Sequence, residues 1–300
     1  MPNLKYYKKI ILGATISGIA AALSYSSRGD VLIIESSMLL GSEFIDSMNI
    51  KSCDLSLRNN ISETACYFLS DLEKRGLIDD SGRLHVFPVS GVLASYIRQS
   101  CINILLMTAV VSVKPSGEGF VITIYNADGF SDVHTSMILD TTSEGCLPEN
   151  QYGLCCSQDF VNYSSCRNSI NYSKSLCAML YSQPGDTLDI CGYIDDEAAV
   201  MEGKYHDAAK YGGEYVLKVN VGCGAEWPEA RHKLHDYWRR KSPDVFAGWK
   251  IASAASSFSY DYENRFSVSA CNGKLVWEPS ASHKDLLSAY DGGAKCSFIR

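Results

Sequence analysis

The stretch that decides the fold is residues 9–35, which read KIILGATISGIAAALSYSSRGDVLIIE. Its apolar runs predict a short buried strand over residues 9–12 and a second strand over residues 31–35. Between them, the Ala-rich residues 16–26 predict a helix. Two strands joined in this way need a crossover of a dozen or more residues, so we expect them to be parallel with a right-handed connection. The stretch therefore predicts a βαβ unit.

The turn between the first strand and the helix, residues 13–18, is the feature that carries chemistry, and we call it the glycine loop. It matches the dinucleotide fingerprint G-x-G-x-x-G except that Thr15 replaces the second glycine. Gly13 suits the tight turn, and Gly18 lets the helix pack closely on the sheet. Glu35 is placed to accept hydrogen bonds from ribose hydroxyls, while the helix N-terminus faces a pyrophosphate. Thr15 either crowds the phosphates or bonds one through its hydroxyl; the alternative is an ordinary βαβ loop with two glycines.

Composition limits the class of protein. The chain has 300 residues, roughly two average domains, and its 46% hydrophobic and 20% charged residues exclude a disordered chain or a coiled coil. Lys and Arg number 27 against 34 Asp and Glu, a net charge of −7, and no run of about five or more basic residues occurs, so we expect no nucleic-acid partner. The 12 cysteines include no C-x-x-C pair, which argues against a zinc ribbon and indicates reduced, mostly buried thiols.

The N-terminus carries one feature typical of exported proteins. Lys5, Lys8 and Lys9 precede the apolar residues 10–23, an order that resembles the basic and hydrophobic parts of a signal peptide. The apolar stretch, about 14 residues, is too short to span a bilayer comfortably, and no A-x-A cleavage site follows it. Cleavage would also remove the partner of the strand at residues 31–35. We therefore expect a cytoplasmic protein with no membrane partner.

Periodicity predicts further elements along the chain. Residues 62–75 and 89–99 show the apolar spacing of amphipathic helices, and Gly76 is placed to end the first. Strands separated by turn residues then predict an antiparallel meander. The expected strands cover residues 103–106, 109–113, 119–125, 133–139, 187–193 and 215–221, and the expected helices of the second half open at residues 195–197 and span residues 226–240.

A family resemblance adds to this pattern. Residues 9–13, 18–22 and 31–35, followed by Leu39-Leu40-Gly41-Ser42-Glu43, resemble the N-terminus of FAD-dependent oxidoreductases with the glutathione-reductase-type fold. In that family a Gly-Gly pair contacting the cofactor follows the ribose-binding acid, and Gly41-Ser42 takes its place. The resemblance extends over about residues 8–146. It implies FAD rather than NAD, because NAD domains lack both the Gly-Gly pair and the inserted meander.

The resemblance also implies site residues. Val110 matches the residue whose backbone usually meets the adenine, and residues 138–145 look like the strand that returns to the nucleotide. The family closes with a Gly-Asp motif and a helix; Asp291 is the nearest match, and only seven residues follow Gly293, so that helix is expected to be truncated or absent. The implied cofactor-binding residues are Gly13, Thr15, Ile16, Ser17, Gly18, Glu35, Ser36, Gly41, Ser42, Val110, Thr141 and Asp291.

Few other residues suggest chemistry. His283 is the acid–base candidate, because it precedes the final element, where family members bring substrate-side residues to the flavin; the alternative is a surface-loop histidine. His232 and His235 lie three apart on the expected helix 226–240, but the neighbouring Asp236 is expected on another face, so we expect no metal site. The vicinal cysteines at positions 155 and 156 are interpreted as a chance pair in a Cys-rich chain.

The predicted fold class is α/β: a Rossmann-like FAD/NAD(P)-binding domain with an antiparallel meander, plus a second mixed α+β substrate domain. The first domain comprises residues 1–146 and about 266–300, and the second about 147–265. The predicted function is an FAD-dependent oxidoreductase acting on a small-molecule substrate. The alternative is a non-catalytic flavoprotein-fold protein that serves as a binding or partner subunit. Self-association or a partner subunit is compatible with both.

Overall fold

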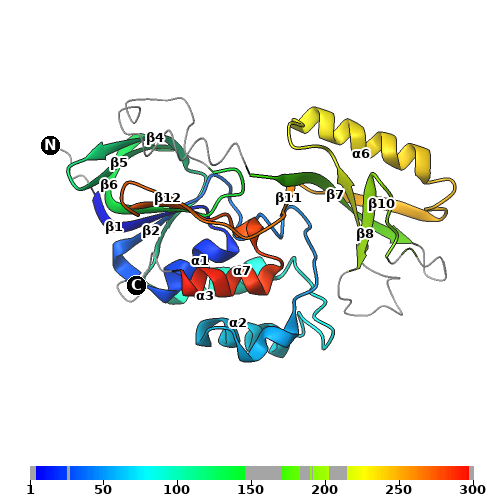
Figure 1. The fold of residues 1–300 in the computed structure, drawn as a ribbon, viewed down its shortest axis with the longest axis horizontal. Coiled ribbons are helices and arrows are strands. Elements are labelled where there is room, and N and C mark those ends of the chain that lie inside the picture. The colour runs from blue at the N-terminus through cyan, green and yellow to red at the C-terminus, as the bar shows by residue number, and fades with distance from the viewer. Residues whose placement is uncertain are drawn as a thin grey trace.

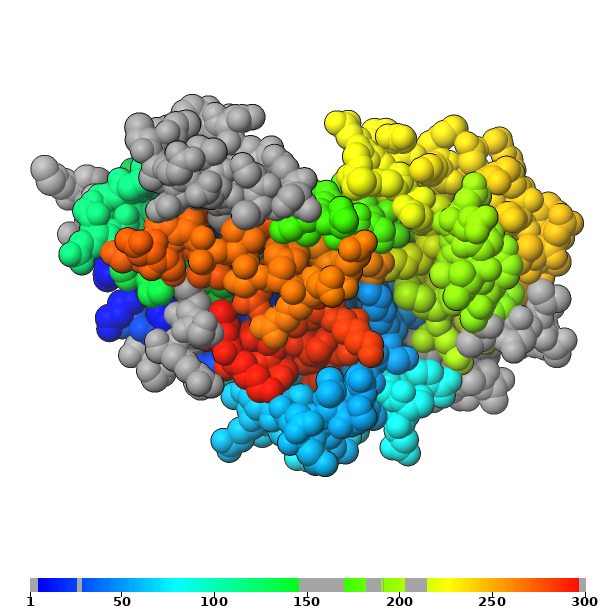
Figure 2. Space-filling view, in the orientation of Figure 1, coloured from blue at the N-terminus to red at the C-terminus, as the bar shows by residue number. Residues whose placement is uncertain are grey.

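The computed structural model describes residues 5–25, 28–145, 170–182, 190, 192–202 and 215–296. Figure 1 shows two parts joined side by side, one built on a large sheet covered by helices and the other on a smaller sheet carrying a long helix. In Figure 2 the C-terminal segment, coloured orange and red, lies against the blue N-terminal half. The C-terminal segment therefore belongs in space with the beginning of the chain.

The predicted βαβ unit is confirmed. Strand β1 (Lys5–Leu12), helix α1 (Ile16–Ser24) and strand β2 (Val31–Ile34) follow one another, and β1 pairs in parallel with β2 from Lys9↔Val31 to Leu12↔Ile34. Neighbouring side chains point to opposite faces of a strand, so Ile11 packs toward the helices while Ile10 and Leu12 pack toward the meander. Both faces of β1 are covered, which explains its continuous apolar run.

Within the described residues the large sheet has eight strands, in the order β12-β13-β6-β1-β2-β3, with β4 and β5 attached through β6. The long strand β6 pairs with β5 antiparallel in its first half and with β1 parallel in its second half, so the predicted meander continues into the central sheet. The added strands are β3 (Asn103–Leu105), β4 (Ala109–Ser116), β5 (Gly119–Asn126), β6 (Gly129–Asp140), β12 (Val268–Ala270) and β13 (Leu275–Trp277).

Helices α1, α2 (Glu63–Lys74), α3 (Val89–Gln99) and α7 (Leu286–Lys295) gather on one side of this sheet (Figure 1). The expectation that the closing helix is truncated or absent is wrong. Helix α7 begins before the Asp-Gly-Gly sequence rather than after it, with Asp285 as its N-cap. It crosses α1 closely: a Cβ on Gly293 would lie 2.0 Å from the carbonyl oxygen of Ser17.

The second sheet is antiparallel, in the order β10-β7-β9-β8 with β11 paired to β7. The expected helix opening at residues 195–197 is wrong. The Asp195 side chain accepts hydrogen bonds from the N–H groups of Glu197 and Ala198, a turn that leads into a strand instead. The elements are β7 (Tyr172–Ser182), β8 (Ala198–Glu202), β9 (Tyr215–Asn220), helix α6 (Trp227–Lys241), β10 (Trp249–Ala254) and β11 (Ser259–Tyr262).

Several expectations meet the structure only in part. Most of the expected strand at residues 187–193 and the vicinal cysteines lie outside the described residues. Among the cysteines that the structure describes, Cys66, Cys101 and Cys223 are exposed, so the expectation of mostly buried thiols holds only for some of them. No helix in the described ranges is long and apolar enough to cross a membrane. The division into two domains stays a prediction.

Candidate functional site

The glycine loop has the backbone that its two glycines allow. Gly13 has φ +95°, in the region that side chains disfavour. A Cβ on Gly18 would lie 2.5 Å from the carbonyl oxygen of Gly13, so only glycine lets α1 approach the end of β1 this closely. Both glycines therefore hold the structural roles that the sequence predicted for them.

Thr15 uses its hydroxyl inside the protein. It is the N-cap of α1: its Oγ1 accepts the N–H of Gly18 at 3.0 Å and donates to Oγ1 of Thr141 at 2.6 Å. The Thr141 hydroxyl in turn donates to the carbonyl oxygen of Leu12 at 3.0 Å. Because Thr15 is only 3% exposed, its side chain belongs to the junction of α1 with β6. The sequence predicted that Thr15 either crowds the phosphates or bonds one of them through its hydroxyl. In the structure this hydroxyl is instead bonded inside the protein, to Gly18 and Thr141.

Backbone N–H groups at the start of α1, the donors that a diphosphate would need, are taken by the protein's own side chains. Ala14 donates to Oε2 of Glu35 at 2.7 Å, and Ile16 donates to Oε1 of Glu43 at 2.7 Å. The next donor, Ser17, reaches Oγ of Ser280 at 3.1 Å. With Gly18 bonded to the N-cap, the first turn of the helix is satisfied without a ligand.

Glu43 is the site residue that sequence reasoning missed. Its carboxylate is buried, and its Oε1 also accepts the Ser280 hydroxyl at 2.6 Å, while its Oε2 has no hydrogen-bond partner among the residues that the structure describes. Burial raises the pKa of Glu43 to about 7, and the negative charge of Glu35 adds to that shift. The only sequence signal was a carboxylate directly after Gly41-Ser42, in the segment that returns to the glycine loop.

Glu35 lies at the end of β2, where the sequence placed it. In addition to Ala14, it accepts the N–H of Ser37 at 2.8 Å and, at 3.4 Å, the hydroxyl of the exposed Ser36. Each carboxylate oxygen carries two lone pairs, so Glu35 keeps acceptor capacity for a ribose hydroxyl. This end of the site fits the role predicted from its position.

The Gly41-Ser42 pair connects the glycine loop with the second sheet. The N–H of Gly41 donates to the carbonyl oxygen of Ala14 at 2.7 Å, and Gly41 has φ +71°. This positive φ disfavours a side chain at Gly41, and a Cβ there would also press on Cδ1 of Ile16 at 2.8 Å. The carbonyl oxygen of Ser42 accepts the hydroxyl of Ser257, which precedes β11, at 3.2 Å. The pair is thus held against both parts of the molecule.

Two other candidates lie apart from the loop. Asp291 accepts the N–H of Ser62 at 2.6 Å and pairs with Lys295 at 2.7 Å, so its carboxylate ties α7 to the start of α2. The residue of the C-terminal segment whose hydroxyl accepts a hydrogen bond from the glycine loop is Ser280, and its N–H also donates to the carbonyl oxygen of Thr141.

Val110 pairs with Ile124 in the meander, and its side chain packs on the core beneath that meander.

A cavity of about 280 Å³ lies between the glycine loop and the second sheet. It is close to the lower limit of roughly 300 Å³ for small-molecule sites. The predicted residues Thr15, Glu35, Ser36 and Ser42 line it together with Glu43. From the other side it is lined by Thr142, Ser143, Trp227, Ser256, Ser257, Phe258 and Tyr260.

His283 borders a larger cavity of about 720 Å³, which is also lined by Lys51, Arg265 and Asp291. The residue is 5% exposed, and among the described residues its Nε2 makes no hydrogen bond, although Oε1 of Glu278 lies 3.7 Å away. Its ring packs on Gly292 of α7, where a Cβ would meet it at 2.0 Å. Burial, together with the positive charge of Arg265, lowers the pKa of His283 to about 4, so the ring is neutral at pH 7.

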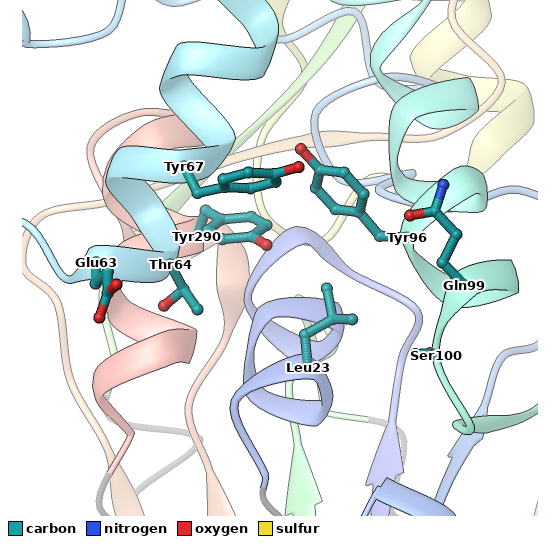
Figure 3. A pocket seen from close by; sticks show the side chains of 8 residues that line it. All are labelled: Leu23, Glu63, Thr64, Tyr67, Tyr96, Gln99, Ser100 and Tyr290. Atoms are coloured by element: carbon teal, nitrogen blue, oxygen red, sulfur yellow. The ribbon is translucent and has the colours of Figure 1, made fainter.

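A third cavity, of about 410 Å³, opens among helices α1, α2, α3 and α7, away from the glycine loop. Figure 3 shows Tyr67, Tyr96 and Tyr290 around it, with Leu23 pointing into it. Tyr96 donates to Asp71 at 2.9 Å, and Tyr290 stacks on Phe68 with 4.1 Å between ring centroids. These rings hold the helices together.

The two histidines of α6 lie on its exposed surface. Nε2 of the exposed His232 lies 3.0 Å from Oδ2 of the half-buried Asp236, an i,i+4 pair, so the expectation that Asp236 points to another face is wrong. Among the described residues no group of three His, Cys, Asp or Glu side chains is arranged to hold a metal ion.

Comparison with known proteins finds likeness in structure alone: no family model and no curated protein matches the sequence. A geranylgeranyl bacteriochlorophyll reductase-like protein from Thermoplasma acidophilum matches with a TM-score of 0.58 and 10% identity, over 97% of this chain and 77% of that one. The myxobacterial chondrochloren halogenase CndH, an FAD-dependent halogenase, matches with a TM-score of 0.57 and 12% identity, over 97% and 72%. Aklavinone-11 hydroxylase, solved with FAD and aklavinone, matches with a TM-score of 0.51 and 13% identity, over 98% and 61%.

These matches establish the fold. The chain has a Rossmann-type α/β fold, as predicted, with a second antiparallel sheet, and it shares this fold with the FAD-dependent halogenase. It spans 61% of the length of the hydroxylase and 60% of the matched protein BexE. The narrower prediction of a glutathione-reductase-type protein stays a prediction.

Proposed function

We propose that this chain is a flavoprotein of the oxidoreductase class, which binds FAD with its adenosine ribose on Glu35 and its diphosphate at the start of α1. The observation that carries the proposal is the glycine loop itself. It stands at the carboxyl ends of parallel strands, beside Glu35, in a fold shared with a hydroxylase solved with FAD. When bound, FAD would supply the hydride or electron chemistry.

The two ends of the site differ in how well they fit FAD. The adenosine end fits, because Glu35 keeps acceptor capacity and borders a cavity. The diphosphate end does not fit in this conformation, because Glu43 and Ser280 hold the N–H groups of Ile16 and Ser17. FAD binding therefore requires the Glu43 side chain to turn away first.

For the substrate we propose the 720 Å³ cavity beside His283. A neutral imidazole can accept one proton at Nε2, which lies 3.7 Å from Oε1 of Glu278, and can return that proton, the role expected of a general acid or base. Lys51 and Arg265 line the same cavity and would orient a polar small molecule. The contribution of the chain is thus binding, orientation and one proton-transfer group.

The proposal is tested by titrating the purified protein with FAD and recording the visible spectrum. We expect bound flavin with bands near roughly 370 and 450 nm. Glu35→Ala should weaken binding, because it removes the ribose acceptor; Glu118→Ala, which removes an exposed carboxylate from the meander, is the matched control. A preparation that takes up no FAD as wild type or as the Glu43→Ala variant would contradict the proposal.

A second function is favoured by one observation. The filled donors of α1 are what a non-catalytic protein on a flavoprotein scaffold would show, since such a protein has no cofactor to satisfy them. Such a protein would act through a partner subunit or a second copy. Absence of FAD binding in every variant, with an oligomer or partner complex seen by light scattering, would favour this alternative.

A further inference from the structure

We infer that Glu43 acts as an internal competitor for the diphosphate, so that a dinucleotide binds this chain only by displacing the Glu43 carboxylate from the N-terminus of α1. The inference rests on the proposed function, because it takes FAD and related adenosine diphosphates as the ligands. It makes Glu43 a residue that determines specificity: ligands with a diphosphate compete with it, and adenosine alone does not.

The position of Glu43 carries the first step. Its Oε1 lies 2.7 Å from the N–H of Ile16 and 2.6 Å from the hydroxyl of Ser280, so one oxygen joins the helix N-terminus to the C-terminal segment. An anion at a helix N-terminus is stabilised by the free N–H groups and the helix dipole. Glu43 thus occupies the position that this fold offers to phosphate.

The charges around Glu43 carry the second step. Within the described part of the chain, no Lys, Arg or His forms an ion pair with it, and the charged group that faces it is Glu35. A diphosphate brought to the same N–H groups would add further negative charge beside both carboxylates. Glu43 and a diphosphate therefore exclude each other.

Few interactions hold the Glu43 carboxylate in place, so a ligand can displace it. In the part of the chain that the structure describes, its carboxylate accepts hydrogen bonds from Ile16 and Ser280, while Oε2 is buried without a hydrogen-bond partner. Its backbone is fixed on either side, because Ser42 accepts from Ser257 and Asp46 accepts from Ser256. Displacement therefore needs a rotation of the Glu43 side chain that takes its carboxylate away from Ile16 and Ser280.

The test compares ADP with adenosine, which differ only in the diphosphate, and adds FAD. Their dissociation constants are measured by calorimetry for wild type, Glu43→Ala, Glu43→Gln and the surface control Glu118→Ala. We expect Glu43→Ala to lower the Kd for ADP and FAD by about tenfold to a hundredfold, the effect of freeing one charge-assisted donor. The Kd for adenosine should stay within about twofold of wild type. Glu43→Gln fills the position without charge and should give a smaller gain.

Three results would count against the inference. Equal Kd values for ADP in wild type and Glu43→Ala would overturn it. An equal gain in affinity for ADP and for adenosine would also overturn it, because it would indicate that the substitution loosens the whole site. Absence of ADP and FAD binding in all variants would instead overturn the proposed function and, with it, the competition.

If neither ADP nor FAD binds, the NMR resonance of the Ile16 amide still tests whether the Glu43 carboxylate is bonded to the N-terminus of α1. It should move with pH between about pH 5 and pH 9 in wild type and stay constant in Glu43→Gln. A wild-type resonance that stays constant would show that Glu43 does not hold the loop at all. The folding of each variant is checked independently by its unfolding transition.

Discussion

The hydroxyl of Thr15 donates to the hydroxyl of Thr141 with 2.6 Å between the two oxygens, although 126 positions separate these residues. Thr15 also caps α1 through Gly18, and Thr141 continues the chain of bonds to Leu12 at the end of β1. A residue that departs from the dinucleotide fingerprint therefore fastens the glycine loop to strand β6. Its contribution to stability can be measured.

The first prediction concerns this bond. Thr15→Gly removes the N-cap and the bond to Thr141, so we expect the free energy of unfolding to fall by about 1–2 kcal/mol. Thr15→Ser keeps the hydroxyl and should lose only about 0.5–1 kcal/mol with the buried methyl group. Urea unfolding of both variants measures the difference. Equal losses would show that the hydroxyl contributes nothing.

The second prediction concerns the approach of α1 to the sheet. Gly18→Ala places a Cβ 2.5 Å from the carbonyl oxygen of Gly13 and 2.7 Å from Oγ1 of Thr141. Because backbone must shift to relieve this overlap, we expect a loss of about 2–4 kcal/mol in the free energy of unfolding. Gly91→Ala is the control: it lies in α3 with open space around it, and should stabilise by about 0.5–1 kcal/mol. Similar effects at both positions would contradict the close packing.

The third prediction follows from the raised pKa of Glu43, about 7 against an ordinary 4.5. The folded state keeps this proton to higher pH than the unfolded state does. The stabilisation is therefore complete below about pH 4.5 and is lost as the pH rises through 7, by up to about 3 kcal/mol. Glu43→Gln should remove this part of the pH dependence. Unfolding measured at several pH values tests it, and an unchanged slope in the variant would rule the contribution out.

The fourth prediction has the opposite sign. The pKa of His283 is lowered to about 4 from an ordinary 6.5, so the unfolded state takes up this proton first as the pH falls. Stability from this group is present above about pH 6.5 and is lost toward pH 4, again by up to about 3 kcal/mol. His283→Asn should flatten the curve in that window, whereas the exposed His235→Asn should not. A curve equally altered by both substitutions would argue against a buried, neutral His283.

Local patterns predicted the elements well where periodicity was strong. The helix at residues 89–99 has the bounds expected of it, and residues 62–75 differ by one residue at each end. The pattern was misleading where a side chain competed with the backbone, as Asp195 does in the turn before β8. The position of α7 was also missed, because the helix was expected after Gly293, whereas Gly292 and Gly293 lie inside it, where it packs closely on His283 and Ser17.

The candidate site divides in the same way. Gly13, Gly18 and Glu35 could be assigned from the sequence, because the strand, turn and helix that place them lie within one short stretch of chain. The sequence named Glu43 only as the residue that follows Gly41-Ser42, and it gave no indication of Ser280. Asp291 was chosen for its neighbouring glycines, although its partners turn out to be Ser62 and Lys295.

The sequence by itself determined the βαβ unit and the shape of the glycine loop, because the spacing of apolar residues and glycines acts over neighbouring positions. Only the tertiary structure decided what the loop binds to. Ser17 meets Ser280 across 263 positions and Ile16 meets Glu43 across 27, contacts made when β13 joins the sheet beside β6 and the 41–47 segment folds back over α1. Hydrogen bonds between distant segments leave no periodic trace in a single sequence, so the occupant of the helix N-terminus became visible only in three dimensions.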